Sequence, residues 1–198
     1  MKIRGSWDRL MRPVGSSLAR LGVTPDAVTY TGLLIQIGVA ALIVQGRLLL
    51  AGLVAIVAAL SDVIDGAVAK ARERPSTFGA FLDSTTDRLS DALYLGPIVW
   101  LYGIDPDIAT HHEPWVAAAA LAALVFGFLV SYAKARAQSL GYDCNVGIME
   151  RAERLILIIA ALVFDLVPPA MVVLAALSLV TFLQRMVHVR LQASAREG

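Results

Sequence analysis

Residues 61–92 read SDVIDGAVAKARERPSTFGAFLDSTTDRLSDA and lie between long apolar stretches. Their five aspartates are Asp62, Asp65, Asp83, Asp87 and Asp91. An aspartate at the centre of a membrane-spanning helix is unfavourable by about 2.5–3.5 kcal/mol on insertion scales. In a chain whose hydrophobic fraction is 58%, these carboxylates therefore need an explanation in the fold or in a ligand.

The composition predicts an all-α integral membrane protein. Once their flanks are included, several apolar runs approach or exceed the roughly 20 residues that span a bilayer. These runs include LLIQIGVAALIV, LLLAGLVAIVAAL, WVAAAALAALVFGFLV and LILIIAALVF. The single cysteine, Cys144, excludes an internal disulfide, and with a net charge of +1 we expect no nucleic-acid partner.

We predict one domain, residues 1–198, with a six-helix bundle over 26–190. The six transmembrane helices are placed at 26–46, 49–71, 80–102, 114–136, 152–167 and 170–190. Lys and Arg gather in the connections on one side, whereas the opposite connections contain only Arg47. By the positive-inside rule, both termini and the aspartate-rich helix ends face the cytoplasm of a multi-pass protein in the cell membrane.

Residues 1–22 are expected to form an amphipathic helix in the cytoplasmic membrane interface. Its apolar residues recur at helical spacing and are Trp7, Leu10, Val14, Leu18 and Leu21. An amphipathic helix packed on protein is the alternative. Next, Thr24 can cap a helix that has Pro25 in its first position. Asp26 and Thr29 would then lie near a helix N-terminus, which favours anions.

The spacing of the aspartates predicts a cation site. Asp62 and Asp65 are three apart and Asp83 and Asp87 four apart, so each pair lies on one helix face. Two antiparallel helices could bring the four carboxylates together, where they either take up protons or bind cations. Oxygen ligands on rigid helices suit Mg²⁺ or Mn²⁺, and two ions about 3.5–4 Å apart could clamp a phosphate oxygen.

Small residues beside the aspartates predict room for a bulky ligand. Gly66, Ala67, Ala69 and Gly79 allow two backbones to approach closely. Basic residues alongside the acidic cluster indicate that the ligand is an anion. A metal-bound pyrophosphate satisfies both conditions.

The same stretch resembles the signature of the CDP-alcohol phosphotransferase family, D-x-x-D-G-x-x-A-R followed after a spacer by G-x-x-x-D-x-x-x-D. Here the two parts run from Asp62 to Lys70 and from Gly79 to Asp87. Lys70 stands where the family usually has Arg, which keeps the charge but loses the two-pronged guanidinium contact with phosphate. The resemblance implies an enzyme with a six-span fold over the whole chain, assembled as a homodimer in the membrane.

The resemblance also implies the roles of individual residues. Mg²⁺ or Mn²⁺, with two ions expected, would be bound by Asp62, Asp65, Asp83 and Asp87. The CDP-lipid would contact Asp26, Thr29, Gly66, Lys70 and Ser76. Asp87 is also the implied general base, which takes a proton from an alcohol. The alcohol oxygen then attacks the β-phosphorus of CDP-diacylglycerol and CMP leaves.

Two stretches, SYAKARAQSLGYDCNVGIMERAERLI at 131–156 and FLDSTTDRLSDA at 81–92, resemble the actinobacterial phosphatidylinositol phosphate synthase branch of this family. That branch transfers the phosphatidyl group to inositol 1-phosphate, whose phosphate is expected in a basic pocket. The matching residues are Lys134, Arg154 and Arg185. Glycerol phosphate is also a phosphorylated acceptor, so a phosphatidylglycerophosphate synthase or another CDP-alcohol phosphotransferase is the alternative.

Other charged residues near the membrane are interpreted as structural. Three of them, expected to determine topology, are Arg136, Arg151 and Arg190. Arg151 could form a salt bridge with Glu150 or Glu153. Asp91 continues the acidic face by one turn and is expected to back the site or to pair with Arg88.

A divalent-cation transporter is the rival of another class, because it too needs carboxylates within the membrane. A transporter predicts polar residues that continue toward the outer face. The outer halves LLLAGLVAIVAAL and LYLGPIVWLYG are almost wholly apolar, which favours an enzyme. His111 and His112, beside Glu113, are assigned to a solvated outer loop rather than to a metal site.

Overall fold

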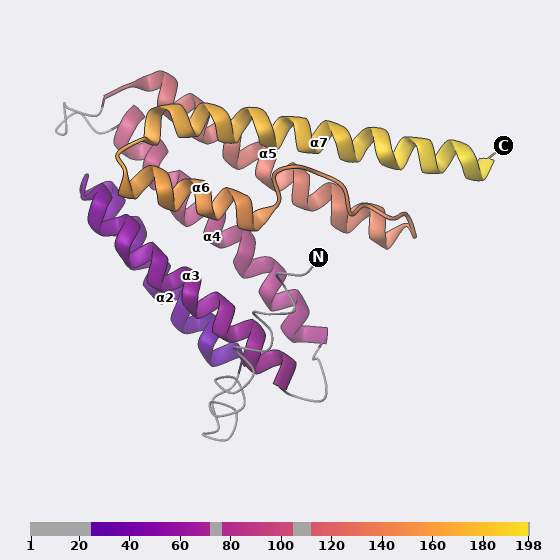
Figure 1. Cartoon of the computed structure of the whole chain (residues 1–198), viewed down its shortest axis with the longest axis horizontal. Coiled ribbons are helices and arrows are strands. Elements are labelled where there is room, and N and C mark those ends of the chain that lie inside the picture. Colours follow the sequence, from indigo (N-terminus) through magenta and orange to yellow (C-terminus); the bar gives the residue numbers. More distant parts are fainter. Residues whose placement is uncertain (1–24, 72–76, 105–111, 198) are drawn as a thin grey trace.

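The computed structural model describes residues 25–71, 77–104 and 112–197, and every regular element in these ranges is an α-helix. The helices are α2 (Pro25–Val44), α3 (Leu48–Ala71), α4 (Thr77–Gly103), α5 (Pro114–Ser139), α6 (Arg151–Val163) and α7 (Val167–Glu197), as Figure 1 shows. The all-α prediction is therefore confirmed for this part of the chain. The amphipathic helix expected in residues 1–22 lies outside the described ranges.

The first four of these helices follow the predicted ranges closely, but the last two do not. Helix α6 ends at Val163 rather than at 167, and α7 begins at Val167 rather than at 170. Pro168 and Pro169 fit within the first turn of α7, where no backbone N–H is needed for the helix. At its other end α7 continues to Glu197, beyond the predicted limit at 190.

Helix ends are closed by residues in the left-handed region. Gly46, with φ 71°, follows α2, and the N–H of Arg47 donates to the Leu42 carbonyl over 3.0 Å. Asp165, with φ 55°, closes α6 in the same way, since the Leu166 N–H donates to the Ala161 carbonyl over 2.9 Å. Tight turns of this kind reverse the chain and make neighbouring helices antiparallel.

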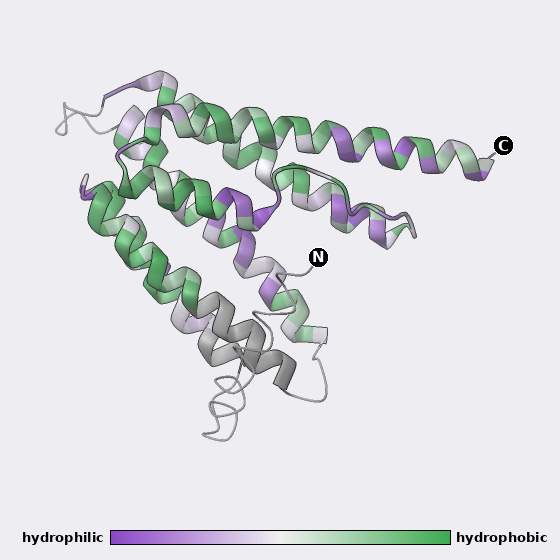
Figure 2. Ribbon diagram, viewed as in Figure 1, coloured by the Kyte–Doolittle hydropathy of each residue, from purple (hydrophilic) through white to green (hydrophobic). Residues whose placement is uncertain are grey.

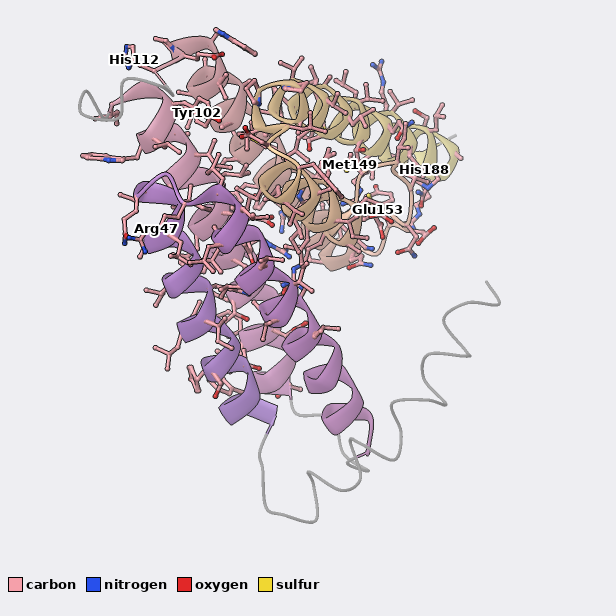
Figure 3. All side chains as sticks on the ribbon, turned by 60° about the vertical axis from the view of Figure 1, so that its left-hand side comes forward. Arg47, Tyr102, His112, Met149, Glu153 and His188 are labelled. Carbon is pink, nitrogen blue, oxygen red and sulfur yellow. The ribbon has the colours of Figure 1, made fainter. Side chains whose placement is uncertain are left out.

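The connections alternate between two ends of the molecule. The α2–α3 turn, the α6–α7 turn and the adjoining ends of α4 and α5 gather at one end in Figure 1. Figure 3 shows Arg47 at this end with Tyr102 and His112, away from Glu153 and His188. This chain path agrees with the predicted one. The number of membrane crossings and the cytoplasmic position of the termini remain predictions.

The interior is built from pairwise helix contacts. Helix α2 packs against α3 and α4, α5 packs against α4 and α7, and α6 lies against α3 and α7. Buried core residues include Val39, Ile43, Leu95, Ile98 and Met171. Where α3 meets α6, Gly52 leaves no room for a side chain: a Cβ there would lie 2.6 Å from Val163 Cγ2 and 3.0 Å from the Val163 backbone nitrogen.

Apolar side chains also cover the outside of the helices. Leu34, Ile156 and Phe164 are 68%, 67% and 70% exposed, respectively. By length and composition, two stretches of the described chain are long and apolar enough to cross a membrane, Pro114–Ser139 and Val167–Arg196. Figure 2 shows hydrophilic residues on α4, at the start of α6, at the end of α5 and along the C-terminal half of α7. This distribution suits helices that contact lipid on the outside and carry polar groups inside.

Gly52→Ala should destabilise the protein, because the new Cβ overlaps the backbone of α6 and forces the helices apart. Overpacking of this kind typically lowers the free energy of unfolding by about 1–3 kcal/mol. The matched control is Gly38→Ala on α2, where a Cβ meets nothing within 4 Å. Thermal unfolding in detergent should show a lower Tm for Gly52→Ala only. Equal Tm values for the two variants would contradict the close α3–α6 contact.

Candidate active site

A small polar cavity lies between α2, α4 and the start of α6. Its volume is about 40 Å³, and it is lined by Thr29, Leu33, Gln36, Asp83, Thr86, Asp87, Ser90 and Arg151. Most of these side chains carry an oxygen atom. The cavity brings together three residues predicted from the sequence, Thr29, Asp83 and Asp87, with others that were not predicted.

Asp87 is held between two arginines. Its Oδ1 lies 2.9 Å from Arg151 Nη1, and its Oδ2 lies 3.1 Å from Arg88 Nη2. Arg151 was expected to determine topology, with Glu150 or Glu153 as a possible salt-bridge partner; its ion pair with Asp87 was not predicted. Within apolar helices a charge is stabilised by an opposite charge on a packed helix, and α6 places Arg151 against α4. Arg151 is thus a component of the site that sequence reasoning missed.

A second ion pair lies deeper, one turn along α4. Arg154 Nη2 is 2.5 Å from Asp91 Oδ2, and the two side chains are 2% and 9% exposed. Asp91 was expected to back the site or to pair with Arg88; Arg88 instead contacts Asp87. Gly127 on α5 gives the buried guanidinium its space, since a Cβ there would lie 3.4 Å from Arg154 Nε. In the described structure Arg154 therefore joins α6 to α4.

A third charged cluster connects α5, α7 and the start of α6. Glu150 Oε1 lies 3.0 Å from Arg185 Nη2 and 3.6 Å from Lys134 Nζ. Arg185 also donates from Nε to the Val146 carbonyl and from Nη1 to the Val130 carbonyl, over 2.8 and 2.6 Å. Of the three residues predicted to bind an acceptor phosphate, Lys134 and Arg185 thus share one carboxylate, while Arg154 pairs with Asp91.

The segment between α5 and α6 is fixed to α7, which positions Glu150. Gln192 accepts from the Asp143 N–H over 3.0 Å and donates to the Asp143 carbonyl over 2.6 Å. Gly147 adopts φ 136°, and a Cβ there would lie 2.4 Å from Thr181 Cγ2. Glycine is required at this position both by its backbone conformation and by the contact with α7.

The cavity residues fit a hard divalent cation. Asp83 and Asp87 offer carboxylate oxygens from one face of α4, and Thr29 lines the same cavity. Such ligands suit Mg²⁺ or Mn²⁺. Within the described residues no group of three or more His, Cys, Asp or Glu side chains is placed to hold a metal. The other two predicted ligands, Asp62 and Asp65, belong to a part of α3 whose side chains are not described.

The remaining predicted contacts fall mostly outside the described side chains. Asp26 lies in α2, Gly66 and Lys70 lie in α3, and Ser76 is outside the described residues. Gln36 was missed: it is 3% exposed and accepts a hydrogen bond from the Ser90 hydroxyl over 2.5 Å. The signal was present in LLIQIGVAALIV, where a single amide in an apolar run requires a partner on another helix.

Known proteins resemble this chain over most of its length. Residues 22–184 match the family described as CDP-alcohol phosphatidyltransferase. An archaetidylinositol phosphate synthase of Methanothermobacter thermautotrophicus is 42% identical over 176 residues, which cover 86% of this chain and 85% of that protein. A phosphatidylinositol phosphate synthase of Mycolicibacterium smegmatis is 35% identical, with 98% of this chain and 90% of that protein covered.

Solved structures show the same similarity. The phosphatidylinositol phosphate synthase of Mycobacterium tuberculosis with CDP-DAG bound has a TM-score of 0.80 and 34% identity, and the match covers 91% of this chain and 94% of that one. The same enzyme in complex with manganese and citrate has a TM-score of 0.78 and 34% identity, with 90% and 88% covered. At this identity the likeness extends beyond the fold to the sequence.

Arg154→Met should destabilise the protein strongly, because Asp91 would remain buried without its cation. Breaking a buried ion pair in this way typically lowers the free energy of unfolding by about 3–5 kcal/mol. The double variant Asp91→Leu/Arg154→Met should recover much of the loss, since no unpaired charge remains. Thermal unfolding in detergent measures both variants. A single variant as stable as the wild type would contradict the structural role of this pair.

Proposed function

Because the chain belongs to the CDP-alcohol phosphatidyltransferase family, we propose that it transfers the phosphatidyl group of CDP-diacylglycerol to inositol 1-phosphate and releases CMP. The observation that carries this proposal is the first turn of α6. There Arg151 contacts Asp87 in the carboxylate cavity, while the preceding Glu150 contacts the cations Lys134 and Arg185. A site for a metal-bound diphosphate and a site for a phosphorylated acceptor would therefore adjoin each other.

The names of the relatives support the inositol acceptor. The Methanothermobacter protein is named for an archaetidyl lipid and the Mycolicibacterium protein for a phosphatidyl lipid, yet both names contain inositol phosphate. The headgroup is thus common to relatives with different lipid parts. We propose diacylglycerol as the lipid part of the donor, in line with the CDP-DAG bound to the Mycobacterium tuberculosis enzyme.

A divalent cation would be held by Asp62, Asp65, Asp83 and Asp87, and we propose two ions. When bound, Mg²⁺ or Mn²⁺ would neutralise the negative charge of the diphosphate and polarise its phosphorus–oxygen bonds. The manganese complex of the Mycobacterium tuberculosis enzyme supports a divalent ion. Asp83 and Asp87 on one face of the cavity are the described part of this ligand set.

Asp87 is the proposed general base. Its ion pairs with Arg88 and Arg151 hold the side chain in one orientation at the cavity. Asp87 would take the proton of the acceptor hydroxyl as the oxygen bonds to the β-phosphorus and the bond to CMP breaks. Burial raises the pKa of the Cys144 thiol, which disfavours the thiolate form. Direct transfer without a covalent enzyme intermediate fits these residues.

The resemblance assigns Lys134, Arg154 and Arg185 to the acceptor phosphate, and we propose Lys134 and Arg185 as its main contacts. The side chain of Lys134 is 34% exposed and that of Arg185 is 3% exposed, so Lys134 is the more accessible cation. Arg154 could reach the acceptor only by leaving Asp91, and we propose that it acts mainly by fixing α6 to α4.

The donor contacts that the resemblance implies form one further set. The CDP part of the donor would contact Asp26, Thr29, Gly66, Lys70 and Ser76. The position of Thr29 on the cavity with Asp83 and Asp87 supports this set. We also propose a homodimer in the cell membrane with the site open to the cytoplasm.

A direct assay tests the reaction. The purified protein with CDP-diacylglycerol and Mg²⁺ or Mn²⁺ should release CMP with inositol 1-phosphate, and much less with glycerol 3-phosphate, serine or free inositol. Removal of divalent ions with a chelator should abolish release. Asp87→Asn is the inactive control, which should lose turnover while it still binds the CDP-lipid. Release with glycerol 3-phosphate alone would assign a phosphatidylglycerophosphate synthase instead.

Lys134→Ala should raise the KM for inositol 1-phosphate, because one phosphate contact is lost. A hydrogen bond to a charged group contributes about 1.5–3 kcal/mol, so the increase should be about tenfold or more. Arg136→Ala is the matched control: it removes an exposed cation of the same helix that donates to Ser139. The KM for CDP-diacylglycerol should change little in either variant. An unchanged acceptor KM in Lys134→Ala would remove this residue from the acceptor site.

A further inference from the structure

We propose that Glu150 is an internal anion that occupies the acceptor-phosphate site until a phosphorylated substrate displaces it. In this role Glu150 determines specificity for acceptors that carry a phosphate. The inference rests on the proposed function, since it takes Lys134 and Arg185 as contacts of the acceptor phosphate.

The geometry points to competition for one position. The same carboxylate oxygen of Glu150 lies 3.0 Å from Arg185 Nη2 and 3.6 Å from Lys134 Nζ. A phosphate oxygen bound by these two cations would have to occupy the place of this carboxylate oxygen. The acceptor phosphate and the Glu150 side chain therefore cannot both hold the cation pair in this arrangement.

Glu150 is not explained by its position at the start of α6. It occupies the N-cap of this helix, but its side chain makes no capping hydrogen bond. Its side chain instead contacts α5 at Lys134 and α7 at Arg185. Glu153, which Figure 3 labels, belongs to the same first turn and is exposed. The two glutamates are close in sequence, but only Glu150 contacts the cation pair in this way.

Burial explains why the cation pair needs an anion at all times. The side chain of Arg185 is 3% exposed, so water cannot solvate its charge, and an unpaired buried charge is strongly destabilising. The side chain of Glu150 is 39% exposed and can turn to solvent when another anion arrives. Exchange of one anion for another keeps Arg185 paired in both states.

Charge then discriminates between acceptors. A phosphate monoester carries about −1.5 to −2 charges at pH 7 and three acceptor oxygens, compared with a single charge on a carboxylate. A phosphorylated alcohol can therefore replace Glu150, whereas an uncharged alcohol leaves Glu150 in place. Arg151, the next residue, contacts Asp87, so the first turn of α6 lies between the exchanged anion and the proposed base.

Glu150→Gln tests this role, because it removes the negative charge and keeps the size of the side chain. We expect the KM for inositol 1-phosphate to fall about three- to tenfold, as an internal competitor is removed. Inorganic phosphate should also raise the Tm of this variant more than that of the wild type. Glu153→Gln is the matched control and should behave as the wild type in both measurements.

Two further variants keep the test decisive. Lys134→Ala/Glu150→Gln should lose the additional stabilisation by phosphate. Glu150→Asp retains the charge but shortens the side chain. Inorganic phosphate should therefore raise its Tm less than that of Glu150→Gln. If Glu150→Gln does not fold, Glu150→Asp replaces it in the test. Equal phosphate-induced Tm shifts in the wild type and in the position-150 variants would overturn the inference. If the phosphate-induced Tm shifts are as expected but the protein does not turn over inositol 1-phosphate, only the proposed function is overturned.

Discussion

Two ion pairs between α4 and α6, Asp87–Arg151 and Asp91–Arg154, constrain the whole candidate site. The residues lie four apart on α4 and three apart on α6, so each pair occupies one face of its helix. In apolar surroundings neither the carboxylates nor the guanidinium groups are favourable alone. The two ion pairs therefore link the start of α6 to α4, and with it the segment that carries Glu150.

The helices and the acidic face could be predicted because they depend on local spacing. The apolar runs determine where helices form, and Pro25 marks the start of α2 as expected from its place in the sequence. Asp83 and Asp87 share a face of α4 for the same reason. The early end of α6 was not predictable, since it depends on Asp165 adopting a left-handed conformation that glycine more often supplies.

The partners of the charges could not be predicted, because they are distant in sequence. Arg154 and Asp91 are 63 residues apart, and many other pairings satisfy charge equally well. Arg151 had Glu150 and Glu153 beside it, and local spacing favoured both over Asp87. The full length of α7 could not be predicted either, because it also depends on contacts between residues distant in sequence. Its last turns are fixed by contacts with the α5–α6 segment, such as that of Gln192 with Asp143, rather than by an apolar pattern.

The shortness of α6 has a consequence for how the protein fits its bilayer. Its 13 residues rise about 20 Å, which is roughly 10 Å less than the hydrocarbon thickness of a typical membrane. On the predicted topology, which puts the α6–α7 turn at one membrane surface, the polar start of α6 would lie beneath the opposite headgroup layer. Water would then have to enter the leaflet to solvate Glu150. A dissolved inositol phosphate and a lipid diphosphate would thus meet at the same depth without the lipid leaving its leaflet.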